Sequence, residues 1–483
     1  MSQSAAQSAA QSAAQSAAPP ARGLVAAVVC SGVVLVNLDL FIVNVAVPAM
    51  ARTWSGADLA DLSWVLNGYA VVFAALLVPA GRLADRSGHR AAFLRGTALF
   101  TLASALCAAA PGVAWLVAAR LLQAGGAAML VPASLGLLLT TTPPERRAAV
   151  VRAWAAIGGL AAALGPVLGG LLVAPGWRWV FLVNVPIGIA AVVLGARVLP
   201  RSAAAARTPM PDLAGALLFV AAVAALALGL VKAEDWGWGS VRVLTALAAF
   251  AVLGTWFAVR TVRHPRPLVE PAVLRVRDFA VAGAASVLFG TAFAGMLLGI
   301  TLWCQDVWGW SALTTGLAFT PGPLLVPPTA VLAGKWAPRI GAGRIAAAGG
   351  VVFAAGTLLW ALGLDADGTY AAAMLPGLLL TGLGVGLMLP TLVAAAATAL
   401  PASHAATGSG VVTMLRQIGA VLGVSVTVLL LGSSASADGY THVWYLLAAV
   451  SSAAAGVALL IRHRVEAPAR AGAAEAGQEA GVG

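Results

Sequence analysis

Charged residues are scarce in this chain. Asp, Glu, Lys and Arg make up 9% of its 483 residues, whereas a soluble globular protein carries about 25%. The mean hydropathy is +0.94, and 61% of the residues are hydrophobic. This composition excludes an ordinary soluble domain and predicts an all-α integral membrane protein that crosses the bilayer many times.

Cysteine and histidine are also rare, with three and five residues. Cys30, Cys107 and Cys304 lie in or beside apolar runs, so we expect small core residues rather than a disulfide. The histidines are widely separated, and we therefore expect no metal site and no cofactor. The longest internal polar stretch, 263–278, has roughly 16 residues, too few for a soluble catalytic domain, since domains usually have at least about 50 residues.

Long apolar runs, by contrast, are abundant. One bilayer crossing needs about 20 mainly apolar residues. Fourteen runs qualify: 24–48, 61–81, 91–110, 113–138, 148–173, 179–199, 212–232, 241–262, 279–302, 312–334, 343–363, 371–394, 407–431 and 442–462.

The distribution of basic residues explains the net charge of +11. Twenty lysines and arginines follow even-numbered runs, and only four lie in the remaining loops. Basic residues concentrate on the cytoplasmic side of membrane proteins. This bias predicts a multi-pass protein of the cell membrane with both termini in the cytoplasm, and it argues against nucleic acid as a partner.

Two loops indicate an internal repeat. Residues 81–88 read Gly-Arg-Leu-Ala-Asp-Arg-Ser-Gly, and residues 334–341 read Gly-Lys-Trp-Ala-Pro-Arg-Ile-Gly. Their offset of 253 nearly equals the offset of 255 between runs 1 and 9. We expect two six-helix halves joined by two extra helices. The expected boundaries are a disordered leader at 1–22, the halves at 23–200 and 279–463, the insert at 201–278, and a disordered tail at 464–483.

Three formally charged residues lie deep inside the apolar runs: Asp39, Arg120 and Arg416. A charge in hydrocarbon is costly and usually functional. At 1.5 Å per helical residue, Asp39 lies roughly 13 Å and Arg120 roughly 10 Å from the outer face, so the two can pair. We expect Asp39 to carry the proton, because burial and Arg120 shift its pKa in opposite directions. A static ion pair is the alternative.

Other polar residues are weaker candidates. Arg120 could instead hold an anionic part of the substrate or water. Gln123 could bind substrate or cap a polar pocket, and Arg416 with Gln417 could contact substrate or a neighbouring helix. Asp306, beside tryptophans at the end of run 9, could be a loop acid or a second proton site.

Two glycine-containing strings predict conformational roles. In 81–88, Gly81 and Gly88 allow a tight cytoplasmic turn, and Asp85 with Arg86 and Arg90 could hold two helix ends together. In 159–170, Gly165 and Gly169 lie one turn apart, so another backbone can pack closely. Pro166 should bend this helix. The remaining glycines of the string are Gly159 and Gly170.

Together these motifs resemble the Major Facilitator Superfamily, and more closely its 14-span drug:proton antiporter branch. The resemblance rests on 81–88, Arg120-x-x-Gln123, 159–170, 39–48, 177–188 and 416–419. One departure is Ala124, where the family usually has Gly. The resemblance implies export of a small amphipathic drug or antibiotic in exchange for protons, with no obligate protein partner.

One buried acid limits the driving force. A proton entering supplies about 2.3 kcal/mol per 100 mV and about 1.4 kcal/mol per pH unit. That suffices for a neutral or monocationic substrate but drives a dication poorly. The alternatives are an importer, an exporter of one endogenous metabolite, or a membrane enzyme or receptor. The string 159–170 disfavours import. An enzyme would need clustered acids or histidines, and a receptor would need a large sensing or output domain.

Overall fold

The computed structural model describes residues 22–54, 56–200, 212–400, 405–432 and 437–462. Most of the expected leader and tail lies outside these ranges. Within them, fourteen helices are long and apolar enough to cross a membrane, as expected. Their edges fall within a few residues of the predicted runs for most spans.

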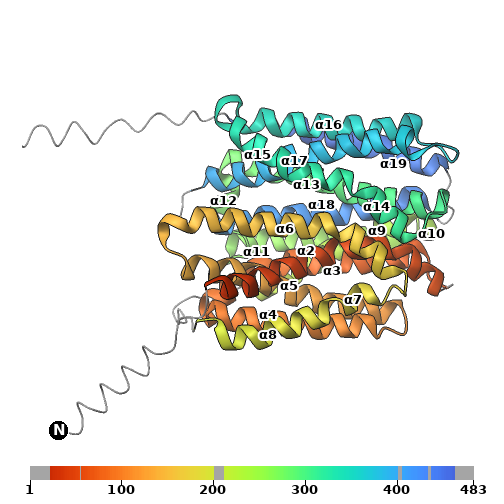
Figure 1. Ribbon diagram of the computed structural model, residues 1–483. Coiled ribbons are helices and arrows are strands. Elements are labelled where there is room, and N and C mark those ends of the chain that lie inside the picture. Colours follow the sequence, from red (N-terminus) through yellow and green to blue (C-terminus); the bar gives the residue numbers. More distant parts are fainter. Residues whose placement is uncertain (1–21, 55, 201–211, 401–404, 433–436, 463–483) are drawn as a thin grey trace, which may run out of the picture.

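The first half of the chain supplies six spans, drawn from red to yellow in Figure 1. They are α2 (Arg22–Thr53), α3 (Leu59–Ser87), α4 (His89–Ala108), α5 (Val113–Thr141), α6 (Pro144–Val173) and α8 (Asn184–Val198), with the short α7 (Trp179–Leu182) before the last. We call the end of the bundle where α2 begins proximal and the end where it finishes distal.

The last six spans form the second half, which lies above the first half in Figure 1. They are α13 (Arg277–Leu302), α14 with α15 (Ala312–Phe319 and Pro321–Ile340), α16 (Ala342–Gly363), α17 (Leu375–Ala399), α18 (Ala405–Leu431) and α19 (Ala437–Ala458). Two π-helical turns, Trp303–Val307 and Tyr370–Met374, extend α13 and precede α17.

Two inserted spans, α9 (Leu213–Val231) and α11 (Val241–Arg263), pack on each other, and α9 also packs on α3 and α18. At the distal end, Lys232 Nζ contacts three carboxylates, those of Asp58 at 2.7 Å, Asp61 at 3.1 Å and Asp235 at 3.2 Å. At the proximal end, Arg260 forms hydrogen bonds of 2.8 to 3.2 Å with Asp212. These contacts fix the insert to itself and to the first half.

Two sequence expectations are wrong in detail. The first run was placed to end near Pro48, but α2 continues to Thr53. A proline removes only its own N–H, and the remaining helical hydrogen bonds can carry the helix past it. The string 81–88 is helical rather than a loop, because α3 runs through Ser87. The chain reverses at Gly88 alone, where φ is 86°.

The internal repeat recurs in the backbone. α15 ends at Ile340, and Gly341 adopts a φ of 98° before α16 begins. Gly88 plays the same part between α3 and α4. A positive φ is readily available to glycine and strained for other residues. The matching turns support the repeat predicted from the two strings.

Candidate functional site

The deep acid lies in a closed hydrogen-bond network inside the first half. Asp39 of α2 is 0% exposed, and its Oδ2 lies 2.5 Å from Nη1 of Arg120 on α5. Its Oδ1 accepts hydrogen bonds from Gln123 Nε2 at 2.8 Å and from Asn184 Nδ2 at 3.0 Å. The similar depths estimated from the sequence allowed these two residues to pair, and in the structure they do. Three donors compensate the desolvation of this carboxylate.

Arg120 is held on several sides. Its Nε donates to the Val65 carbonyl at 3.1 Å, and its Nη1 donates to Gln123 Oε1 at 2.7 Å. The guanidinium carbon lies 4.1 Å from the ring centroid of Tyr69 and 5.8 Å from that of Phe181. Aromatic faces favour a desolvated cation at such distances. Arg120 is thus positioned by the protein and not by Asp39 alone.

Gln123 completes the network rather than facing open space. It is 0% exposed, and its Nε2 donates to Ser104 Oγ at 2.9 Å in addition to Asp39. Of the two roles considered from the sequence, the geometry corresponds to capping a polar cluster.

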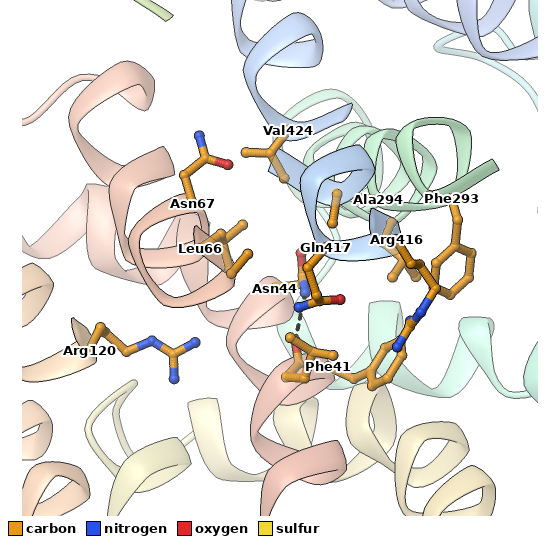
Figure 2. Close-up of a pocket in the computed structure, with 15 residues that line it drawn as sticks. Phe41, Asn44, Leu66, Asn67, Arg120, Phe293, Ala294, Arg416, Gln417 and Val424 are labelled. Carbon is orange, nitrogen blue, oxygen red and sulfur yellow. Dashed lines mark hydrogen bonds between the residues drawn. The ribbon is translucent and has the colours of Figure 1, made fainter. Parts of the chain in front are cut away.

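A cavity of about 60 Å³ lies between the two halves (Figure 2). Arg120 lies on one side of it and Arg416 of α18 on the other. Its lining comes from α2, α3, α5, α13 and α18: Leu40, Phe41, Asn44, Leu66, Asn67, Ala70, Arg120, Gly290, Phe293, Ala294, Leu297, Arg416, Gln417, Ala420 and Val424. Pockets for drug-sized ligands measure about 300–1,000 Å³, so the cavity in this conformation is smaller than such a pocket.

Two residues of α18 face this cavity without partners. Within the described part of the chain, no hydrogen bond or ion pair involves the guanidinium of Arg416. Gln417 is 2% exposed, and its Nε2 is buried with no hydrogen-bond partner. Both residues therefore line the cavity with hydrogen-bond donors that the described part of the protein does not use.

The two halves meet closely toward the distal end. Asn67 Nδ2 of α3 donates to Ser425 Oγ of α18 at 3.1 Å. Gln305 Nε2, past the end of α13, donates to the Val45 carbonyl of α2 at 3.0 Å. The first bond lies on the distal side of Arg416 along α18, and the second lies on the distal side of Asp39 along α2. The two halves are therefore hydrogen-bonded to each other on the distal side of these residues.

Glycines also allow the backbones of α6 in the first half and α14 in the second half to touch. A Cβ on Gly170 would overlap the Ala312 carbonyl, and one on Gly316 would overlap the Pro166 carbonyl. Gly169 lies against the Ile42 carbonyl of α2, at 3.0 Å from its ideal Cβ position. We call Gly169, Gly170 and Gly316 the glycine interface. The close backbone packing predicted for 159–170 is confirmed, although Gly159 itself has no neighbour within 4 Å.

A sequence profile of the Major Facilitator Superfamily matches residues 29–424. The chain belongs to this superfamily. A probable actinorhodin transporter of Streptomyces coelicolor is 36% identical over 439 residues, covering 87% of this chain and 75% of the relative. The multidrug resistance protein Stp of Mycobacterium tuberculosis is 35% identical over 398 residues, covering 82% and 73%.

Solved structures support the superfamily fold. A crystal structure of the peptide transporter POT with sulfate superposes with a TM-score of 0.68, covering 90% of this chain and 94% of that one. The sequence identity is 17%, so this likeness concerns the fold alone.

The superfamily string at 81–88 forms contacts at the proximal end. Asp85 Oδ1 lies 3.6 Å from His89 Nε2, and Arg90 donates to the Ala196 carbonyl at 2.6 Å. Arg82 donates to the Pro267 carbonyl at 3.1 Å and lies 3.6 Å from Glu270. The string thus contacts the segment after α11 through Arg82, and Arg90, two residues beyond the string, connects α4 to α8.

Asp306 lies apart from the cavity between the two halves. It occupies the π-helical turn after α13 rather than a loop, is exposed, and does not line the cavity. The sequence analysis assigned no role to Asn184 or Ser104, both of which belong to the Asp39 network. Asn184 is the first residue of α8. A polar residue in a mainly apolar run indicates a buried polar contact, and this feature of the sequence could have identified it.

Proposed function

We propose that this protein is a proton-coupled antiporter that exports small amphipathic compounds, drugs or antibiotics, across the cytoplasmic membrane. One observation carries the proposal. A buried Asp39–Arg120 pair adjoins a cavity between two halves, and Arg120 belongs to both. The names of the relatives, which include a tetracenomycin C resistance and export protein, agree with such cargo. In this proposal both termini are cytoplasmic, and the distal end faces outward.

The proton step follows from burial. Asp39 is 0% exposed, so water does not reach its side chain in the present conformation. Parting of the halves on the distal side would bring water to Arg120, weaken the pair and allow Asp39 to take a proton. The distal side would then close and the cytoplasmic side would open. Arg120 would pair with Asp39 again, and the proton would leave toward the cytoplasm. Rocking of two repeats around a central site is how such transporters alternate access.

The proposed antiport also defines which partners and reactions transport requires. Transport requires the lipid bilayer, protons and a small-molecule substrate, but neither nucleic acid, nor a catalytic reaction, nor an obligate protein partner. The functional units are the halves at 23–200 and 279–463, with 201–278 as an accessory insert. Export of one endogenous metabolite remains the second candidate, because several relatives are named for single compounds.

Transport by purified protein in liposomes tests the proposal. A panel of lipophilic compounds is presented with an imposed pH gradient, in both orientations of the gradient. We expect flux of at least one compound to follow the direction of the gradient and to stop when an ionophore collapses it. Flux that ignores acidity on both sides would rule out proton exchange.

A further inference from the structure

The charge of the central cavity is unbalanced. Among the described residues, Arg120 and Arg416 are the only ionisable ones that line it, and the carboxylate of Asp39 compensates Arg120. Arg416 has no such compensation among the described residues. An arginine remains protonated in proteins. The cavity therefore presents one net positive charge to its contents.

The backbone fixes where Arg416 points. A Cβ on Gly290 of α13 would lie 2.5 Å from the Arg416 carbonyl, so α13 and α18 touch at this level. Farther along, Gly419 and Gly423 press against the carbonyls of Val287 and Thr291. Since backbone fills this contact, the side chain extends into the cavity, where Figure 2 shows it near Phe41 and Phe293.

The unsatisfied groups on α18 are donors, and the one buried acceptor without a partner among the described lining residues is Asn67 Oδ1 of α3. The guanidinium of Arg416 offers N–H groups in a planar fork that matches a carboxylate or similar oxyanion. The neighbouring Gln417 Nε2 is a second unpaired donor, and it is buried. A buried donor without a partner is costly. A ligand that supplies acceptor oxygens at this position removes that cost and so binds more tightly. A cationic ligand would instead meet an uncompensated positive charge.

Aromatic side chains flank the donors. Phe41 and Phe293 face each other edge to face, with ring centroids 6.1 Å apart and planes at 64°. Leu40, Leu66 and Leu297 extend the apolar wall. Rings of this kind favour a flat aromatic ligand.

We propose that the substrate is an acidic aromatic amphiphile, and that Arg416 and Gln417 bind its carboxylate or phenolate oxygen. This inference rests on the proposed function and narrows it, since it replaces the expectation of neutral or monocationic cargo. It also agrees with the driving forces. When a monoanion leaves in exchange for an entering proton, the membrane potential assists both movements.

Binding of three matched probes tests this inference. The probes are 2-naphthoic acid, its primary carboxamide and 2-(aminomethyl)naphthalene, which are anionic, neutral and cationic at pH 7. Calorimetric titration uses the purified full-length protein in nanodiscs. We expect the acid to bind at least tenfold more tightly than the amide and the amine to bind most weakly. An amine that binds as tightly as the acid would overturn the proposal.

Variants assign the preference to one residue. In Arg416→Gln the acid should lose at least tenfold in affinity, while the amide changes less than threefold. Arg416→Lys should keep the order of the three probes with a smaller acid preference. Arg344→Gln removes an exposed arginine at the start of α16 and should change nothing. An unchanged acid-to-amide ratio in Arg416→Gln would contradict the assignment.

Transport separates this inference from the proposed function. If the amide is carried along the pH gradient and the acid is not, the antiporter stands and the acidic substrate class fails. If the acid binds through Arg416 but no probe moves with the gradient, the binding site stands and proton-coupled export fails.

Discussion

Nη1 of Arg120 lies 2.5 Å from Oδ2 of Asp39, and neither side chain is more than 1% exposed. Because water reaches neither charge, each depends on the other for compensation. Removing one partner of a buried pair typically costs about 3–5 kcal/mol, whereas replacing both can be nearly neutral. Comparing the stability and the transport of single and double variants therefore distinguishes a proton carrier from a static structural pair.

Asp39→Asn should abolish proton-dependent transport while the protein remains inserted. The amide keeps the shape of the carboxylate but cannot exchange a proton, and it leaves Arg120 uncompensated. We expect the free energy of unfolding to fall by about 3 kcal/mol, measured by thermal unfolding in detergent alongside flux in liposomes. Full export by Asp39→Asn would remove this residue from the mechanism.

The double variant Asp39→Asn/Arg120→Gln serves as the control. With both charges gone, most of the lost stability should return, but transport should not. Recovery of transport together with stability would identify the pair as purely structural.

Gly170→Ala should weaken closure of the distal end. The new methyl group would overlap the Ala312 carbonyl, which belongs to a backbone and cannot rotate away. We expect transport to fall at least fivefold and a cysteine placed at Asn67 to react faster with an impermeant thiol reagent. Gly159→Ala in the same string meets nothing within 4 Å, so it should be neutral. Equal behaviour of the two variants would refute the role of the glycine interface.

Lys232→Gln should loosen the insert in a pH-dependent manner. Burial disfavours the charge of Lys232, but hydrogen bonds to Asp58, Asp61 and Asp235 outweigh this and raise its pKa. Burial likewise opposes ionisation of Asp58, yet hydrogen bonds from Lys232 and the Asp61 N–H lower its pKa below the ordinary 3.8. The pairs therefore stabilise the fold above the unfolded pKa of Asp58 and below that of Lys232.

The expected difference in stability between wild type and Lys232→Gln is about 1 kcal/mol, because these pairs are partly exposed. Thermal unfolding should show a constant difference from pH 5 to 9. The difference should shrink as the pH falls below about 4 and Asp58 takes up a proton. A difference that grows in acid would contradict this assignment.

Gly88→Ala and Gly341→Ala should be destabilising to a similar degree. Both glycines adopt a positive φ, at 86° and 98°, where an L-residue loses roughly 1–2 kcal/mol. Gly334→Ala, inside α15 with no neighbour within 4 Å, provides the comparison. Unfolding of the three variants in detergent measures the effect. If Gly334→Ala costs as much as the other two, backbone conformation is not the cause.

Hydropathy predicted the spans because crossing a bilayer imposes length and apolarity on each segment. Helical rise placed Asp39 and Arg120 at similar depths, since depth follows from position along a helix, and so allowed the two to pair. The rotation of each helix about its own axis was not predictable in this way. It brings Asn184 to Asp39 and Tyr69 under Arg120, and it depends on packing between segments that lie far apart in the sequence.

The extent of α3 was misjudged for a local reason. Residues 81–88 contain charges and two glycines, which favour a loop in soluble proteins. In the structure Gly81 remains helical and only Gly88 leaves the helix. Charged side chains at the end of a membrane helix reach the headgroup region while their backbone stays helical.

Close backbone contact at the glycine interface limits which residues can occupy these positions. A carbonyl group abuts the bare Cα atom of Gly170 and of Gly316, so any larger residue there must push two backbones apart. A saturation library at either position should therefore return glycine alone among the transport-competent clones.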